Sequence, residues 1–195
     1  MQLVQPIRDR KQIDAMKKIL KATNLRDYCS FTVGINSGLR ISDLLHLEVG
    51  DVVTERGHLV ERIVLREQKT GKVKNFPMGS QSQKTLREYV SVRFGKLSAI
   101  TDKDSLAPLF LSKKGGFLQR AQAWKILNKA ARAIGIEENI GTHTLRKSFA
   151  YHAYSQGMDI TRLQMLLNHA SPKITLAYIG ITQDELDEVY LTLDL

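Results

Sequence analysis

Hydrophobic residues recur at intervals of three and four along most of the chain, which is the spacing of one face of a helix. Residues 10–22 predict an amphipathic helix of this kind, with Ile13, Met16, Ile19 and Leu20 on its apolar side. The same spacing predicts further helices at 25–36, 81–95, 119–135, 144–156, 159–168, 172–179 and 183–192. Gly38 is expected to end the second helix, and Ser42 and Asp43 to cap a short third one through residue 47.

A different pattern occupies residues 58–77. Residues 58–66 are rich in β-branched side chains and predict a strand, and residues 72–77 predict a second one. Gly71, in the turn between them, supplies the positive φ that a tight hairpin requires. Residues 108–111 are expected to be extended as well. The sequence therefore predicts one mainly α domain over residues 1–195 with a small antiparallel sheet, an α+β fold.

Composition excludes several classes of protein. No apolar run approaches the ~20 residues needed to span a bilayer, and the N-terminus lacks the apolar region of a secretory signal. Cys29 is the single cysteine and lies in an apolar stretch, so we expect a buried, reduced thiol in a cytoplasmic protein. No Cys/His cluster has metal-ligand spacing, and no metal or other cofactor is expected.

The charge is positive and unevenly distributed. The chain has a formal net charge of +9, with 29 Lys and Arg against 20 Asp and Glu. All 29 basic residues but only 15 of the acids lie in residues 1–173, so this part carries +14 and the C-terminal part is acidic. A body this basic favours a nucleic-acid partner, although a solvated basic surface remains the alternative.

Three local motifs carry candidate chemistry. Residues 38–45, Gly-Leu-Arg-Ile-Ser-Asp-Leu-Leu, place Arg40 at a helix start in an apolar segment. His143 and Arg146 lie three residues apart, which puts both side chains on one face of a helix. Tyr178 follows His169 by nine residues.

In order and spacing, these motifs resemble those of the tyrosine recombinase (phage-type integrase) family. The family's catalytic domain has a Gly-Leu-Arg segment followed by an acid, a lysine on a β-hairpin, a His-x-x-Arg box, and a Leu-Gly-His-x-Ser segment with a tyrosine nine residues beyond its histidine. All five elements are present between residues 38 and 178. The resemblance implies an enzyme that breaks and rejoins DNA through a 3′-phosphotyrosyl intermediate, without metal or ATP.

The resemblance also implies a role for each residue. Arg40 and Arg146 would clamp the scissile phosphate, since each guanidinium offers a planar fork of donors. His169 would hydrogen-bond the same phosphate, His143 would aid proton transfer, and Asp43 would support Arg40. Lys69, at the hairpin tip, would protonate the leaving 5′ oxygen, and Tyr178 would be the nucleophile.

Each assignment has an alternative. In the alternative, Arg40 only pairs with Asp43 on its helix, His143 is a structural residue of a helix end, and His169 is a core histidine. Lys72 or Lys74 is the alternative to Lys69 as the acid. The rival tyrosines lack the nine-residue offset; they are Tyr151, Tyr154 and Tyr190.

The sequence departs from the family pattern at two places. Asn168 precedes His169 where the family usually has Gly, a mild change because Asn tolerates a left-handed backbone. The N-terminal core-binding domain of longer members is expected to be absent, because Arg40 lies close to Met1. The acidic helix at about 183–195 is expected to dock either on a neighbouring protomer or on its own core.

The expected partners are double-stranded DNA and other protomers on it, with no membrane, in the bacterial cytoplasm at the nucleoid. Two other functions remain open. A type IB topoisomerase shares the Arg/Lys/His/Tyr chemistry, and a DNA-binding accessory module would need no nucleophile.

Overall fold

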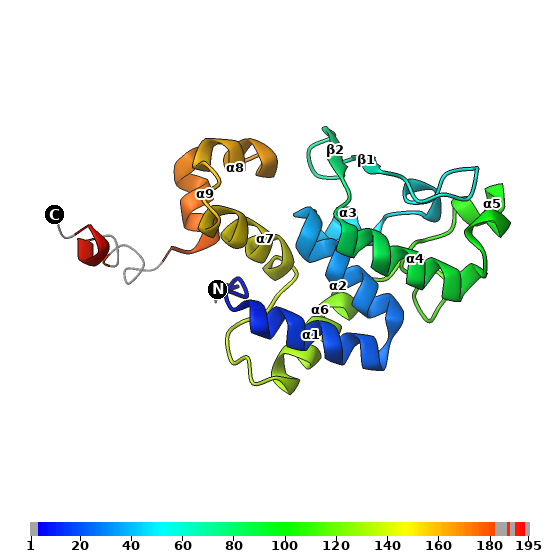
Figure 1. Ribbon diagram of the computed structural model, residues 1–195, viewed down its shortest axis with the longest axis horizontal. Coiled ribbons are helices and arrows are strands. Elements are labelled where there is room, and N and C mark those ends of the chain that lie inside the picture. The colour runs from blue at the N-terminus through cyan, green and yellow to red at the C-terminus, as the bar shows by residue number, and fades with distance from the viewer. Residues whose placement is uncertain (1–3, 182–186, 188–189, 194–195) are drawn as a thin grey trace.

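The computed structural model describes residues 4–181, 187 and 190–193. Helices dominate, and the strands form a hairpin, as predicted (Figure 1). In chain order the elements are α1 (Arg10–Thr23), α2 (Leu25–Ser37), α3 (Ile41–Leu45), η1 (Val49–Asp51), β1 (Arg62–Arg66), β2 (Val73–Pro77), α4 (Ser80–Phe94), η2 (Leu97–Ala99), α5 (Asp102–Ser105), α6 (Arg120–Ala133), α7 (Thr144–Ser155), α8 (Ile160–Leu167) and α9 (Pro172–Ile179).

Helix α2 lies at the centre of the main core. It packs against α1, α4, α7 and α3, and most of its residues are buried. Cys29 on this helix is fully buried, as expected, and burial raises the pKa of its thiol far above the usual value. Gly38 ends α2 with a φ of 59°, where its missing side chain leaves room for the ring of Phe149. The chain therefore turns sharply at Gly38 and delivers Arg40 to the start of α3.

The hairpin is shorter than the sequence pattern suggested. Strands β1 and β2 are antiparallel, and their register ends where Arg62 faces Pro77. The predicted strand over 58–66 therefore begins only at residue 62, because the chain before it turns through Gly57 and forms an isolated bridge at Leu59. Gly71 has a φ of 66°, which confirms the prediction for the turn.

A second, smaller hydrophobic cluster holds the last three described helices together. Ala150 of α7 packs there with Leu163 and Leu167 of α8 and with Ile179 of α9. Asn168 ends α8 with a φ of 53°, and no other non-glycine residue in the described ranges has a positive φ. Helix α9 thus returns beside α7, so the C-terminal part of the fold presents Tyr178 to the side of α7 that carries Arg146.

The residues before α1 tie this C-terminal part to the rest. The amide of Ile7 donates to Ser148 Oγ on α7 across 2.8 Å, and Arg8 donates to the carbonyl of Gly180 across 2.7 Å. Partners 141 and 172 residues apart in the sequence are joined in this way.

The prediction that Ser42 and Asp43 cap α3 is wrong: Arg40 is the N-cap residue and no side chain caps the helix, because the Asp43 carboxylate accepts the backbone amide of Gln68 instead. The helix predicted at 183–192 lies mostly outside the described residues, as does most of the acidic segment at 183–195. Residues 108–111 form only isolated bridges, at Pro108 and Leu111.

Candidate active site

Two arginines from distant parts of the chain form the centre of the site. Arg146, in the first turn of α7, is buried, and it donates to the carbonyl of Gly38 across 2.7 Å and to that of Leu167. Burial and the nearby charge of Arg40 lower the pKa of Arg146 from its ordinary value. The corner between α2 and α3 therefore lies against α7, which brings both guanidiniums to one place.

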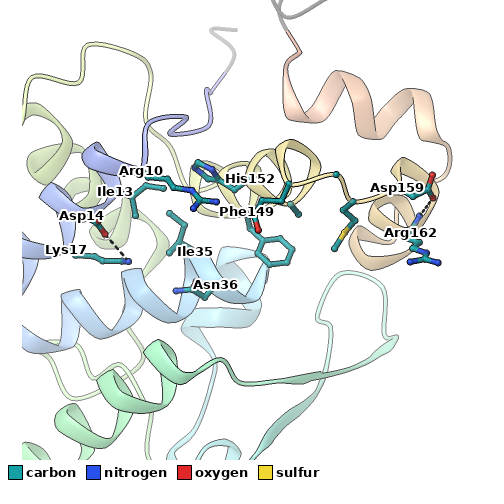
Figure 2. A pocket seen from close by; sticks show the side chains of 14 residues that line it. Arg10, Ile13, Asp14, Lys17, Ile35, Asn36, Phe149, His152, Asp159 and Arg162 are labelled. Atoms are coloured by element: carbon teal, nitrogen blue, oxygen red, sulfur yellow. Dashed lines mark hydrogen bonds and ion pairs between the residues drawn. The ribbon is translucent and has the colours of Figure 1, made fainter. Parts of the chain in front are cut away.

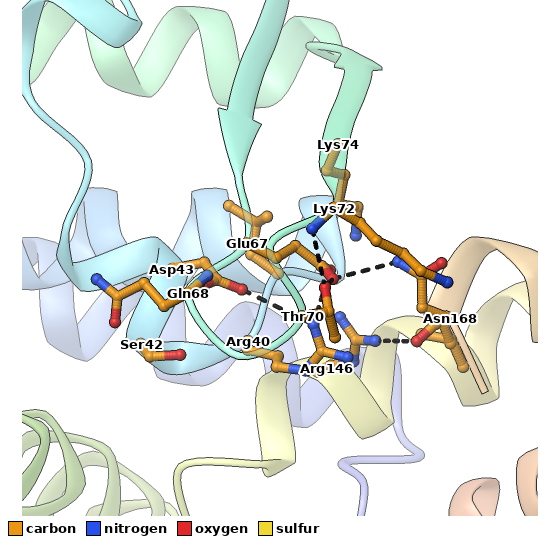
Figure 3. A network of polar contacts seen from close by, with 12 residues as sticks. Arg40, Ser42, Asp43, Glu67, Gln68, Thr70, Lys72, Lys74, Arg146 and Asn168 are labelled. Atoms are coloured by element: carbon orange, nitrogen blue, oxygen red, sulfur yellow. Dashed lines mark hydrogen bonds and ion pairs between the residues drawn. The ribbon is translucent and has the colours of Figure 1, made fainter. Parts of the chain in front are cut away.

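Glu67 is the anion of this cluster, and the sequence reasoning missed it. Its carboxylate, fully buried at the end of the hairpin strand, pairs with Arg40 across 2.7 Å (Figure 3). It also accepts hydrogen bonds from the Thr70 hydroxyl at 2.6 Å and the Asn168 amide at 3.2 Å. Burial raises the pKa of Glu67, but the Thr70 hydrogen bond and the Arg40 and Arg146 charges outweigh it and leave the pKa below its usual value.

A sequence signal for Glu67 exists. It follows Ile63 and Leu65 at intervals of two, so it continues the inward-facing side of β1 beyond the end of the strand. A charged side chain on the buried face of a strand requires an ionic partner. This reasoning would have predicted a cation beside the hairpin.

Asp43 holds the hairpin against α3. One of its carboxylate oxygens accepts the amide of Gln68 at 2.9 Å, and the other lies 4.0 Å from the Arg40 guanidinium. Arg40 is thus closer to Glu67 than to Asp43, so the simple i,i+3 pair considered from the sequence is the weaker contact.

The three lysines of the hairpin have different surroundings. Lys69 and Lys72 are exposed in and next to the turn, whereas Lys74 on β2 is buried and donates to the carbonyl of Gly38 across 3.4 Å. Burial, reinforced by Arg146 and Arg40, lowers the pKa of Lys74 to about 8. The fold therefore places Lys74 inside the cluster and leaves Lys69 free to extend from the hairpin tip.

The two candidate histidines flank Arg146. His143 is the N-cap residue of α7 and is exposed, while His169 follows the left-handed Asn168 and contacts the Thr175 hydroxyl across 3.1 Å. Partial loss of solvent around each ring lowers the pKa of both, and the charge of Arg146 adds to this. Arg120, Lys147 and Lys69 also lower the pKa of His143, so the tip lysine lies within electrostatic reach of it.

Tyr178 lies next to this pair of arginines. Its ring contacts the His169 ring edge-on, with centroids 4.9 Å apart and planes at 71°, and its hydroxyl is buried. Burial raises the pKa of Tyr178 above its usual value, and the charges of Arg146 and Arg40 oppose that rise. A phenol held beside two guanidiniums is placed to act on an anion bound between them.

The fold therefore brings together Arg40, Asp43, Arg146, His169 and Tyr178, with Lys69 and His143 at its edge. Within residues 4–181, 187 and 190–193, no group of His, Cys, Asp and Glu has the composition of a metal site. Among the described residues, no helix is long and apolar enough to cross a membrane.

A groove of about 1030 Å³ lies elsewhere, between α1, α2, the end of α7 and the start of α8 (Figure 2). Arg10, Phe149 and Arg162 are among the residues that line it. None of the six predicted catalytic residues lines this groove, so the candidate chemistry occupies a different surface.

Comparison with known proteins identifies the family. The Phage integrase family matches residues 8–185. The chain belongs to this family. It is 40% identical over 190 residues to the probable integrase/recombinase YoeC of Bacillus subtilis, covering 97% of each chain. It is 35% identical over 180 residues to the tyrosine recombinase XerD of Corynebacterium glutamicum, covering 91% of this chain and 56% of XerD.

Solved structures of recombinases have the same fold. The XerA recombinase matches with a TM-score of 0.75 at 24% identity, over 98% of this chain and 64% of XerA. XerH bound to a palindromic difH substrate, in a post-cleavage complex, matches with a TM-score of 0.72 at 20% identity, over 93% of this chain and 51% of XerH. The chain thus spans nearly all of YoeC but little more than half of XerD and XerH.

These findings confirm the predicted family and fold class. The chain is a tyrosine recombinase catalytic domain, and its family consists of enzymes that break and rejoin DNA. The assignment of individual catalytic residues remains a prediction that rests on the geometry described above.

Proposed function

We propose that this domain cleaves and rejoins double-stranded DNA at specific sites, with Tyr178 as the nucleophile. The observation that carries the proposal is the convergence of Tyr178 with Arg146 and Arg40, which come from three separate segments of the chain. Two preorganised guanidiniums neutralise the charge that grows on a scissile phosphate, so no metal is needed for this task. Removal of one such donor typically costs about 3–4 kcal/mol of transition-state stabilisation.

In the proposed cleavage step, the Tyr178 oxygen attacks phosphorus and loses its proton as the bond to the 5′ oxygen breaks. His143 accepts that proton, because its lowered pKa leaves the imidazole largely neutral at neutral pH. Lys69 donates a proton to the leaving 5′ oxygen, and His169 donates a hydrogen bond to the phosphate. The products are a 3′-phosphotyrosyl bond and a 5′ hydroxyl, and the reverse attack rejoins a strand without ATP.

The proposed partners are double-stranded DNA and further copies of the chain bound to it. The XerH relative in complex with difH supports this proposal, as does the +14 charge of residues 1–173. With such a partner, we expect the protein at the nucleoid of the bacterial cytoplasm. Docking of the acidic segment 183–195 on a neighbouring protomer remains a prediction. Unchanged assembly and cleavage after deletion of residues 183–195 would rule out the docking.

A nicked suicide DNA substrate tests the nucleophile. The native chain is expected to form a covalent adduct with DNA, Tyr178→Phe to form none, and Tyr154→Phe, which alters an exposed tyrosine, to retain it. An adduct that persists in Tyr178→Phe contradicts the proposal. Relaxation of supercoils without strand exchange would indicate topoisomerase activity, and DNA binding without any adduct would indicate an accessory module.

A further inference from the structure

Lys147 is a buried cation of α7 whose ammonium lies against the ring of the proposed nucleophile. Only 7% of the residue is exposed, and its Nζ atom is 5.2 Å from the centroid of the Tyr178 ring. Among the described residues, this ammonium has no ion pair with a carboxylate. A lysine this buried is rarely found without an anionic partner, so its place beside an aromatic ring requires an explanation.

The ring of Tyr178 is held from two sides by groups that match its charge distribution. An aromatic ring is negative over its faces and positive at its edge. Lys147 is placed over the ring as a cation–π contact, and His169 makes an edge-on contact with centroids 4.9 Å apart. These contacts restrict the plane of the ring and therefore the direction in which the hydroxyl points.

Consecutive residues of α7 act on different parts of the tyrosine. The charge of Arg146 opposes the rise that burial causes in the pKa of the Tyr178 hydroxyl, whereas Lys147 lies over the ring. When the hydroxyl loses its proton, negative charge spreads into the ring. A cation over the ring is then attracted more strongly than it is to the neutral phenol.

We propose that Lys147 is a positioning residue for cleavage, which fixes the ring of Tyr178 and stabilises the charge that the ring gains as the phenol is deprotonated. The proposal rests on the proposed function, since it requires Tyr178 to be the nucleophile. The proposal assigns a role to Lys147, a buried cation that is not part of the proposed phosphate clamp of Arg40 and Arg146. The carbonyls that Arg146 contacts, Gly38 and Leu167, are not contacts of Lys147.

Charged groups from several elements act on this pair and bear on its pH dependence. Tyr178 is influenced by Arg146 and Lys147 of α7, by His169 of the α8–α9 turn, and by Arg40 at the start of α3. Lys147 is influenced by Arg8, which precedes α1. Burial and, secondarily, the Arg8 charge hold the pKa of Lys147 below its usual value.

The test compares Lys147→Met and Lys147→Arg with the native chain in single-turnover adduct formation at saturating suicide substrate. Met has a similar length without charge, and Arg keeps the cation. We expect Lys147→Met to form the adduct about 3- to 30-fold more slowly, the range given by typical cation–π strengths. We expect Lys147→Arg to retain most of the rate. Lys18→Met, on an exposed residue of α1, controls for the loss of one positive charge.

Two further measurements separate positioning from a merely structural role. The midpoint of thermal unfolding of Lys147→Met should equal or exceed that of the native chain. The reason is that an apolar side chain replaces a buried cation that has no anionic partner among the described residues. The rising limb of its pH–rate profile should move to higher pH, because both Tyr178 and His143, the proposed proton acceptor, have lost a nearby positive charge. An unchanged rate, or a slower rate with a lowered midpoint and an unmoved pH profile, overturns the proposal.

The outcome is distinguishable from failure of the proposed function. If the native chain forms an adduct that Tyr178→Phe lacks, and Lys147→Met matches the native rate, only the role of Lys147 is wrong. If the native chain forms no Tyr178-dependent adduct, the proposed function itself fails.

Discussion

The side-chain amide of Asn168 donates a hydrogen bond to the buried carboxylate of Glu67 across 3.2 Å. This contact joins the turn that carries His169 to the hairpin that carries Lys69. Glycine, usual at this position in the family, would allow the same left-handed backbone but has no amide to donate. The contact therefore depends on Asn168, the residue at which this chain departs from the family pattern.

Asn168→Gly should keep the left-handed turn and lose the contact with Glu67. Hydrogen bonds to charged groups are typically worth about 1.5–3 kcal/mol, so we expect a loss of that order in the free energy of unfolding, measured in urea. Asn168→Ala is the matched control, since it loses the same amide and also strains the backbone. Equal stability of Asn168→Gly and the native chain would show that the contact contributes nothing.

Glu67→Gln should lower the free energy of unfolding and remove part of its dependence on pH. A buried pair that loses one partner typically costs about 3–5 kcal/mol, because the other charge is left uncompensated. The pKa of Glu67 is lowered in the folded state, so its contribution to stability is present above its usual value of 4.5 and is lost as the pH falls below it. Urea unfolding between pH 3 and pH 7 should show this loss in the native chain and less of it in Glu67→Gln. Parallel curves would contradict the prediction.

Lys69→Ala should slow cleavage at a normal phosphodiester by about 100- to 10,000-fold, the usual contribution of a general acid. A substrate with sulfur in place of the leaving 5′ oxygen needs no such acid, because a thiolate leaves readily, so it should restore the rate. Lys72→Ala, which alters another exposed lysine of the same hairpin, should leave the normal rate unchanged. If the sulfur substrate instead restored the rate of a Lys72 or Lys74 variant, that lysine would be the general acid.

Lys74→Met should stabilise the folded chain at neutral pH. The pKa of Lys74 is lowered to about 8, so the folded state binds fewer protons than the unfolded state between that value and the ordinary 10.5. Stability of the native chain should therefore rise with pH across this window, and the rise should be smaller in the variant. We expect a gain of roughly 1–3 kcal/mol at pH 7, measured by urea unfolding. A loss of stability would show that the contact with Gly38 outweighs the cost of burial.

DNA affinity should fall steeply with salt, because contacts to phosphates release counterions. The logarithm of the binding constant is expected to fall linearly with the logarithm of salt concentration, with a slope of about −0.9 for each phosphate contacted. Fluorescence anisotropy with a labelled duplex at several salt concentrations measures this slope. A binding constant that stays flat from low to moderate salt would contradict the prediction.

The sequence predicted the parts of the site that depend on local spacing. The interval between His169 and Tyr178, and the glycine at the hairpin turn, are visible in the chain itself. Partners set by tertiary packing were not predicted. Asp43 was assigned to a helix cap because nothing local indicated that it would accept the amide of Gln68, and the ionic role of Glu67 depends on where α3 meets the hairpin.

The same limit applies to the lysines of the hairpin and α7. Alternation along β2 separates buried from exposed positions, but it does not show that Lys74 shares the Gly38 carbonyl with Arg146. The sequence alone does not distinguish Lys147, because a lysine beside a functional arginine on a basic helix is ordinary. Its burial against the tyrosine ring becomes visible only when α9 is placed beside α7.

The hydrogen bond between Arg8 and Gly180 also bears on how the protein is made. Because its partners are 172 residues apart, this contact forms only after residue 180 has left the ribosome. A nascent chain carries both arginines of the proposed clamp before it carries Tyr178, the proposed nucleophile. On that proposal, the groups that hold a phosphate are synthesised before the group that attacks it.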